Sequence, residues 1–321
     1  MKKYDVVALG ELLIDFTENG ISPQGNPVFE ANAGGAPCNV LAMLSRLGKK
    51  TAFIGKVGND NFGRSLKKSA EEAGIDMTGL AVSGSVPTTL AFVHTLADGD
   101  REFSFYRNPG ADMTLSENEV NLELVQACRI FHFGSLSMTD EGCRRATEKA
   151  IEAAKEAGAI LSFDPNLREP LWNRLEEAAE RIAYGMSKCD ILKISDNEIL
   201  WFTGCKDYDS AVEMILKSYA NISLLIVTFG KKGSRAYMGG ITAEMPSFQV
   251  KTIETTGAGD TFCGCVLNFV LENGFQKYSE EQLKNMLIFA NAAAAVVTTR
   301  KGALRVMPGR EEIEKMCRER K

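Results

Sequence analysis

The chain alternates between short, almost continuously apolar segments and longer segments with helical periodicity. Strands that are apolar on both sides are typical of a parallel sheet covered on both faces. The alternation therefore predicts an α/β fold, a three-layer sandwich around a central, mostly parallel sheet. The predicted strands are DVVALG (5–10), TAFIGKVG (51–58), RIFHFGS (129–135), AILSFDP (159–165), DILKIS (190–195) and LLIVTFG (224–230). The predicted helices span about 36–47, 61–73, 140–157, 174–187, 196–203, 209–219, 260–273 and 280–299.

Two segments, residues 11–33 and about 80–107, break this alternation. Both show turn signals and strand-like alternation without a helical pattern. The second contains Asp98-Gly99 between two alternating runs, which is a strong hairpin signal. We expect both segments to supply antiparallel strands to a small β-sheet lid. Because no linker or repeat interrupts the chain, residues 1–321 are expected to form a single α/β domain.

Composition limits the classes of function. The net charge is −5, and lysine and arginine are scattered, which argues against nucleic acid or a membrane surface as partner. No apolar run approaches the roughly 18 residues of a membrane helix. The eight cysteines form no Cys-x-x-Cys pair, which predicts reduced thiols and a cytoplasmic location. The two histidines are too few for a histidine-rich metal site, and no Gly-x-Ser-x-Gly elbow indicates a Ser-His-Asp triad.

The segment ETTGAGDTF (254–262) places a glycine-rich turn directly before a predicted helix. Helical spacing of apolar residues after Asp260 predicts that the helix begins at about that residue. Free N–H groups at a helix start bind anions, and Gly257, Ala258 and Gly259 let a phosphate approach them closely. Asp260 can cap the helix, or it can accept a proton from a hydroxyl held over these amides. The motif alone leaves both interpretations open.

A second glycine motif, NAGGAPCNVLAMLSRLG (32–48), also begins a predicted helix. Gly34 and Gly35 precede the helix and Pro37 suits its first turn. Asn39 is a poor helix former, and its amide can both donate to and accept from a sugar hydroxyl. A capping or exposed asparagine is the alternative. Neither glycine motif matches the Walker or G-x-G-x-x-G pattern, so a nucleotide site must lie elsewhere, for example at VTFGKKGS (227–234).

Taken together, these motifs resemble those of the ribokinase-like (PfkB) carbohydrate kinase family. The likeness runs from ALGELLIDF (8–16) to TTRKGA (298–303) and includes GGAPCNV (34–40), LGKKTAFIGKVGNDNFG (47–63) and TTGAGDTFCG (255–264) in order. It implies a ribokinase-like sandwich with a β-lid. The subfamily indicated by FYRNPGAD (105–112) and FDPNLR (163–168) is the fructokinases.

The resemblance also implies roles for individual residues. Asp260 matches the catalytic base and the 257–259 turn matches the anion hole. The implied sugar-binding residues are Asp15, Gly34, Gly35, Asn39, Arg107 and Arg168, with Arg107 reaching from the lid. The implied ATP-binding residues are Lys193, Ser195, Glu198, Thr228, Gly230, Gly233 and Asn291. The implied metal sites are Glu198 for Mg²⁺ through water, and Glu254, Thr256 and Gly302 for K⁺.

The resemblance implies ATP-dependent phosphorylation of the primary hydroxyl of D-fructose, with ATP and Mg²⁺ as cofactors and K⁺ as a further ion. The open edges of a lid sheet need cover, which predicts a homodimer formed through the lid. The alternatives within the family are kinases for 2-keto-3-deoxygluconate, ribose or aminoimidazole riboside. A kinase-like regulator without catalytic activity is the remaining alternative.

Three positions depart from the family pattern. Glu254 stands where the family usually has aspartate beside the potassium ion. The segment GALRVMP (302–308) lacks the usual Pro-Ser of the same ion site. Ser195 replaces the more common asparagine of the Asn-x-x-Glu motif, a position at which fructokinases vary.

Overall fold

A central nine-stranded sheet organises the protein in a computed structural model that describes residues 2–95 and 101–319. Its strand order is β13-β12-β11-β10-β9-β8-β1-β4-β5. Neighbours from β11 to β5 are parallel, and only β12 and β13 add antiparallel pairs at one edge. The strands are β1 (Tyr4–Leu9), β4 (Thr51–Gly58), β5 (Ile75–Ser83), β8 (Cys128–Gly134), β9 (Ile160–Asp164), β10 (Ile191–Ser195), β11 (Leu224–Thr228), β12 (Ser234–Met238) and β13 (Ile241–Met245).

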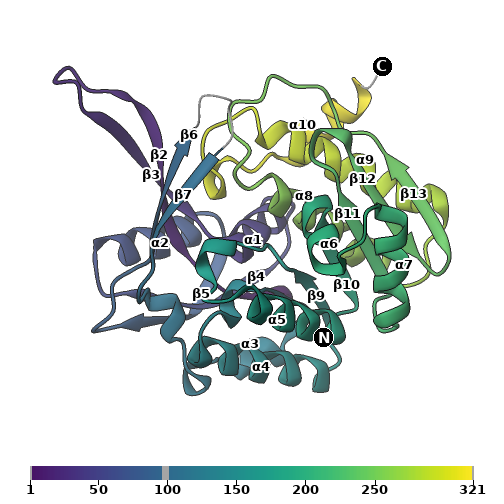
Figure 1. Ribbon diagram of the computed structural model, residues 1–321, viewed down its shortest axis with the longest axis horizontal. Coiled ribbons are helices and arrows are strands. Elements are labelled where there is room, and N and C mark those ends of the chain that lie inside the picture. Colours follow the sequence, from purple (N-terminus) through teal and green to yellow (C-terminus); the bar gives the residue numbers. More distant parts are fainter. Residues whose placement is uncertain (1, 96–100, 320–321) are drawn as a thin grey trace.

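Helices cover both faces of this sheet, so the predicted three-layer sandwich is confirmed (Figure 1). One face packs against α1 (Ala36–Arg46), α2 (Asn61–Glu72), α8 (Ala258–Asn273), α9 (Glu280–Val297) and α10 (Arg310–Arg318). The other face packs against α3 (Leu122–Gln126), α4 (Glu141–Glu156), α5 (Leu175–Lys188), α6 (Asp196–Thr203) and α7 (Tyr208–Ser218). Alternate residues of β1 enter the two cores, Val6 one and Val7 the other, which explains why the strand is apolar throughout.

Local signals fix where these helices begin and end. Asp60 and Asp140 accept hydrogen bonds from the first-turn amides of α2 and α4. Gly48, Gly74 and Gly158 follow three helices with φ of 81°, 83° and 70°, a conformation that glycine adopts without steric cost. Helix α8 begins at Ala258, slightly before the expected Asp260. Within the described residues, no helix is both long and apolar enough to cross a membrane.

A separate four-stranded sheet, ordered β3-β2-β6-β7, forms the lid. Its strands are β2 (Leu13–Ile21), β3 (Pro27–Gly34), β6 (Leu90–Thr95) and β7 (Arg101–Tyr106). Figure 1 shows the β2–β3 hairpin projecting from the body of the molecule.

The lid differs from the sequence expectation in two details. Residues 80–83 lie in β5 of the central sheet, an edge strand whose half-exposed side chains alternate like those of a lid strand. The lid is also not wholly antiparallel, because β2 pairs with β6 in parallel. The Asp98-Gly99 turn lies outside the described residues. Short 3-10 helices complete the chain, at Ala111–Thr114 (η1), Glu117–Glu119 (η2), Leu136–Met138 (η3), Glu169–Leu171 (η4), Gly230–Lys232 (η5) and Leu304–Val306 (η6).

The topology also locates the ligand crevice. After β1 the chain builds β4 and β5 on one side, and then crosses to build β8 on the other. Ligands of open parallel sheets bind beyond the carboxyl ends of the strands at such a reversal. The ends of β1, β9, β10 and β11 carry Glu11, Asp164, Ser195 and Thr228 at or just beyond them, so polar side chains converge there.

Candidate active site

A cavity of about 560 Å³ lies between the lid and the carboxyl ends of the sheet strands. It is lined by side chains from far-apart segments of the chain, including most of the residues that the sequence assigns to sugar binding and catalysis. The predicted residues in its lining are Asp15, Gly35, Asn39, Arg168, Lys193, Thr256, Gly257, Gly259 and Asp260. The fold therefore brings the two glycine motifs together, although they are separated by more than two hundred residues in the sequence.

Asp260 occupies the first turn of α8, behind a turn that has no room for a side chain. Gly257 has φ 76°, and a Cβ there would lie 2.9 Å from the Cβ of Ala303. Asn39 Nδ2 donates to Asp260 Oδ2 at 2.8 Å. Asn39 therefore orients the Asp260 carboxylate, in addition to its predicted role in sugar binding. Burial raises the pKa of Asp260, and the Asn39 hydrogen bond opposes that shift. Asp260 is therefore a half-buried, oriented carboxylate with an affinity for protons above that of an ordinary aspartate.

Lys193 brings a buried positive charge to the same cavity. Its Nζ donates to Asp164 Oδ2 at 2.9 Å, and both side chains are almost fully buried. Burial acts to lower the pKa of Lys193, but the carboxylates of Asp164 and Glu198 outweigh it and raise that pKa, so the ammonium stays charged. A Cβ on Gly259 would lie 3.2 Å from Nζ. The ammonium group thus lies beside the glycine turn, where it can stabilise an anion.

Glu198 lies at the start of α6, where it forms a capping box with Ser195. Its Oε1 accepts from Leu167 N at 2.7 Å, and its Oε2 accepts from Ser195 N at 2.8 Å and from Ser195 Oγ at 2.6 Å. Burial opposes ionisation, but Lys193 and these hydrogen bonds outweigh it and hold the pKa of Glu198 below its usual value. Glu198 is therefore an ionised carboxylate close to Lys193.

A second cavity, of about 470 Å³, adjoins the first at Gly259 and Thr255, which line both. Its lining includes Ala258 and the predicted nucleotide residues Thr228, Gly230, Gly233 and Asn291. The Asn291 amide is held within the protein: Nδ2 donates to Met245 O at 3.2 Å, and Oδ1 accepts from Ser234 Oγ at 3.1 Å. Two ligand-sized spaces therefore meet at the turn that precedes Asp260.

Gly34 lies against Asp15 at the base of the lid. A Cβ on Gly34 would lie 2.2 Å from Asp15 Oδ2, closer than any real contact. Only glycine at position 34 therefore leaves room for the Asp15 carboxylate at its present position on the cavity wall.

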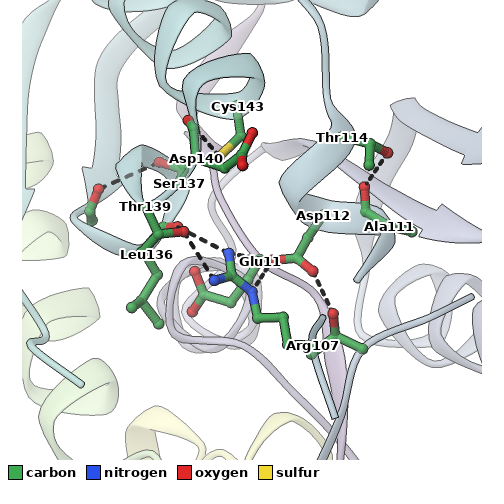
Figure 2. Close-up of polar contacts among 12 residues, drawn as sticks. Glu11, Arg107, Ala111, Asp112, Thr114, Leu136, Ser137, Thr139, Asp140 and Cys143 are labelled. Atoms are coloured by element: carbon green, nitrogen blue, oxygen red, sulfur yellow. Dashed lines mark hydrogen bonds and ion pairs between the residues drawn. The ribbon is translucent and has the colours of Figure 1, made fainter. Parts of the chain in front are cut away.

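Arg107 lies outside the lining of either cavity. Its side chain is buried, and Figure 2 shows it surrounded by polar groups. Nε donates to Asp112 Oδ2 at 2.7 Å, Nη1 to Thr139 Oγ1 at 2.9 Å and Nη2 to Leu136 O at 3.1 Å. Asp112 also accepts from Thr89 Oγ1, directly before β6. Arg107, which is predicted to reach the sugar, here fastens the adjacent lid strands β6 and β7 to the body, and Phe105 of β7 lines the cavity.

Glu254 directly precedes the 255–257 turn. Its Oε2 accepts from Gly302 N at 2.8 Å, whereas Oε1 is buried with no hydrogen-bond partner in residues 2–95 and 101–319. Gly302 has φ 92° and directly precedes Ala303, which packs on Gly257. A buried carboxylate oxygen without a partner is suited to a cation. The described residues contain no group of three or more His, Cys, Asp or Glu that could hold a metal by themselves.

Eight residues that line the larger cavity are absent from the predicted site: Glu11, Leu13, Ala36, Phe105, Leu136, Asn166, Asn197 and Thr255. Asn166 has a positive φ of 45°, which the sequence does not reveal. Glu11 directly follows the first predicted strand, and an acidic residue at the carboxyl end of a buried parallel strand is the signal that could have identified it.

Comparison with known proteins gives a consistent result. The model of the pfkB family of carbohydrate kinases matches residues 3–310. A protein of Arabidopsis thaliana described as probable fructokinase-2 is 46% identical over 94% of this chain and 92% of its own. The crystal structure of a fructokinase with bound ATP from Xylella fastidiosa has a TM-score of 0.89 at 33% identity, covering 99% of both chains. A fructokinase double mutant from Vibrio cholerae, in a form with fructose, ADP and potassium ion bound, has a TM-score of 0.88 at 27% identity, covering 99% of both chains.

Proposed function

The chain belongs to the pfkB family of carbohydrate kinases, and we propose that it phosphorylates D-fructose with ATP to give fructose 6-phosphate. The observation that carries this proposal is the position of Asp260 at the junction of two cavities. The cavity that holds Asp15, Asn39 and Arg168 takes the sugar, and the cavity behind Gly259 takes the nucleotide. Relatives described as fructokinases, at 42–46% identity over nearly the whole chain, support fructose as the sugar.

In the proposed reaction Asp260 removes the proton from the primary hydroxyl of the sugar as that oxygen attacks the γ-phosphorus of ATP. The bond from the γ-phosphorus to the bridging oxygen breaks, and ADP leaves. The amides of the 257–259 turn and the Lys193 ammonium stabilise charge on the transferring phosphoryl group, because catalysis of this reaction is mainly positioning and electrostatics. The lid covers the sugar and excludes water, which limits hydrolysis of ATP.

Two carboxylates fit a magnesium ion at the phosphates. Glu198 is ionised and accepts three hydrogen bonds, which leaves room for one more donor such as a metal-bound water. Asp164 Oδ1 is buried and lacks a hydrogen-bond partner among the described residues. A bound Mg²⁺ would neutralise negative charge on the phosphates, and it commonly needs only one or two protein carboxylates.

A panel of sugars tests the proposed substrate. With ATP, Mg²⁺ and a coupled assay of ADP release, we expect the highest kcat/KM for fructose among fructose, 2-keto-3-deoxygluconate, ribose and aminoimidazole riboside. A higher value for one of the other three would assign the protein to that activity of the same family. Absence of ADP release with all four would contradict the proposed reaction.

Glu254 makes potassium activation a specific expectation. Its partnerless oxygen beside the anion-binding turn supports a monovalent cation there, with Thr256 and Gly302 nearby, although glutamate carries one more methylene than the usual aspartate. We expect K⁺ to raise the kcat of the wild type, and Glu254→Gln to abolish this response while retaining the hydrogen bond to Gly302. The measurement is kcat in KCl and in choline chloride at equal ionic strength. Equal rates in the two salts for the wild type would contradict a potassium site.

Gly34→Ala tests the position of Asp15. The added methyl group displaces the Asp15 carboxylate, so we expect the fructose KM to rise about 10- to 100-fold, the value of a charge-assisted hydrogen bond. The KM for ATP should not change. Gly84→Ala is the matched control, because a Cβ at Gly84 would meet nothing within 4 Å. A fructose KM within twofold of the wild type for Gly34→Ala would remove Asp15 from sugar binding.

The lid also supports association of two copies. Ile21, Val28 and Tyr106 on the lid are 69%, 39% and 66% exposed, an unusual set of large apolar side chains to leave in water. A homodimer that buries the lid sheet would cover them. Static light scattering should then give twice the monomer mass, and Ile21→Glu should halve it. A cytoplasmic location accords with the thiols, since none of the eight cysteines forms a disulfide.

A further inference from the structure

Glu11 is a buried acid in the sugar cavity with no assigned role. It lies two residues beyond the end of β1, is 5% exposed, and lines the same cavity as Asp15 and Asp260. Its Oε1 accepts from Ala36 N, the first residue of α1, at 2.7 Å. Apart from its own amide, no other group in the part of the chain that the structure describes donates to this carboxylate.

Glu11 also lacks an ion-pair partner within residues 2–95 and 101–319. Figure 2 shows its carboxylate beside the guanidinium of Arg107, whose hydrogen bonds go to Asp112, Thr139 and Leu136. The charged and titratable groups that face it are Arg107 and Asp112 at the base of the lid and the Cys38 thiol of α1. Burial raises the pKa of Glu11 to about 7, and hydrogen bonds from its own amide and that of Ala36 oppose the shift. Glu11 is thus a buried carboxyl group that takes up a proton more readily than an ordinary glutamate and has no ion pair among the described residues.

The position of this carboxylate is fixed by the sugar-binding turn itself. Gly35 has φ 120°, and a Cβ there would lie 2.4 Å from the backbone oxygen of Glu11. The strand end that carries Glu11 is therefore in direct contact with the Gly34-Gly35 turn. Together with the hydrogen bond to Ala36 N, this contact sets the Glu11 carboxylate on the same wall as Asp15 and Asn39.

We infer that Glu11 is a sugar-binding residue, whose free carboxylate oxygen accepts a hydrogen bond from a hydroxyl of the sugar other than the one that is phosphorylated. This inference rests on the proposed sugar kinase function. Glu11 lines the cavity, and Ala36 N occupies only one of its two carboxylate oxygens, so a polyol in the cavity can donate to the other. Because the acceptor is a carboxylate, the hydrogen bond is of the stronger, charge-assisted type and can discriminate among sugars by the orientation of one hydroxyl.

The competing role for Glu11 is that of a cap for α1. The cap and the sugar-binding residue predict different results with deoxy sugars. Glu11→Gln retains an oxygen for Ala36 N but loses the charge, so the turn stays in place. We expect the fructose dissociation constant, measured by calorimetry, to rise about 10-fold or more for this variant. Among monodeoxy fructoses, the analogue that lacks the partner hydroxyl should bind wild type and variant equally. An equal loss for fructose and for every analogue, or no loss for any, would overturn the inference.

Asp190→Asn is the matched control. Asp190 is a half-buried carboxylate that likewise accepts from a backbone amide, Leu161 N at 2.8 Å, but it lies outside the cavity. The same carboxylate-to-amide change there should leave sugar binding unaltered. A wild type that neither binds nor phosphorylates fructose would contradict the proposed function itself, whereas an active wild type without the deoxy-sugar effect would overturn only the role of Glu11.

The pH dependence of sugar binding gives an independent readout. An ionised Glu11 is the better acceptor, so fructose affinity of the wild type should rise as pH increases through about 7. Glu11→Gln should lose this rise, and any dependence that remains would belong to other groups such as Asp260. The same pH profile in both proteins would overturn the inference.

Discussion

Asp260→Asn will lower the kcat for fructose phosphorylation by about 10²- to 10⁴-fold, the usual contribution of a general base. Asparagine has the shape of aspartate and can still accept from Asn39, so fold and sugar binding should be retained. Only the capacity to take a proton is lost. A coupled ADP assay gives kcat, and calorimetry with fructose reports whether the sugar still binds.

Asp140→Asn is the control that distinguishes a catalytic base from a helix cap. Asp140 caps α4 by accepting from Gly142 N, and it lies outside both cavities. Asparagine caps a helix about as well as aspartate, so Asp140→Asn should keep full turnover. Turnover of Asp260→Asn within a few-fold of the wild type would show that Asp260 is a cap and not the base.

In the wild type, the raised pKa of Asp260 should place the acidic fall in kcat at a higher pH than an ordinary aspartate would.

Arg107→Met will destabilise the protein by about 3–5 kcal/mol, the cost of leaving one member of a buried ion pair without its partner. Arg107 and Asp112 side chains are each 3% exposed, so water cannot solvate the carboxylate that remains. The free energy of unfolding, from urea denaturation, measures the loss. Adding Asp112→Asn should restore part of it, because the buried charge is removed while the hydrogen bond from Thr89 is kept.

An exposed pair supplies the comparison. Arg145 and Glu141 are 59% and 64% exposed in an i,i+4 pair, so Arg145→Met should cost only about 0.3–0.5 kcal/mol. A loss below about 1 kcal/mol for Arg107→Met would show that this ion pair does not fasten the lid. If Arg107 contacts the sugar, as the family resemblance implies, the variant would instead raise the fructose KM without loss of stability.

The sequence predicted the layers and most of the helices, though not α3 or α10, because the relevant signals are local. Caps such as Asp60 and Asp140, and glycines such as Gly48, mark helix ends without reference to the rest of the chain. The edges of both sheets were harder to predict. Strand β5 alternates in burial because it is an edge strand, and the parallel pairing of β2 with β6 joins segments that are far apart in sequence.

The site shows the same division between local and long-range features. Asp260 and its glycine turn follow from a short motif, and the structure adds that Asn39 orients the base. The buried pair of Arg107 with Asp112 could not be predicted, because the residue type and spacing are equally compatible with a surface contact. Only the packing of the lid base on Leu136 and Thr139 makes Arg107 an interior residue.

The two cavities draw on different lengths of the chain. Every residue that lines the nucleotide cavity lies between Thr228 and Thr298, whereas the sugar cavity uses segments from Glu11 to Asp260. Substitutions in the segment before Asp164 can therefore alter the acceptor without touching the donor side. The turn around Gly259 lines both cavities, so a substitution there affects the sugar site and the nucleotide site together. Such a division lets one scaffold diverge in its choice of sugar during evolution while it inherits its phosphoryl donor unchanged.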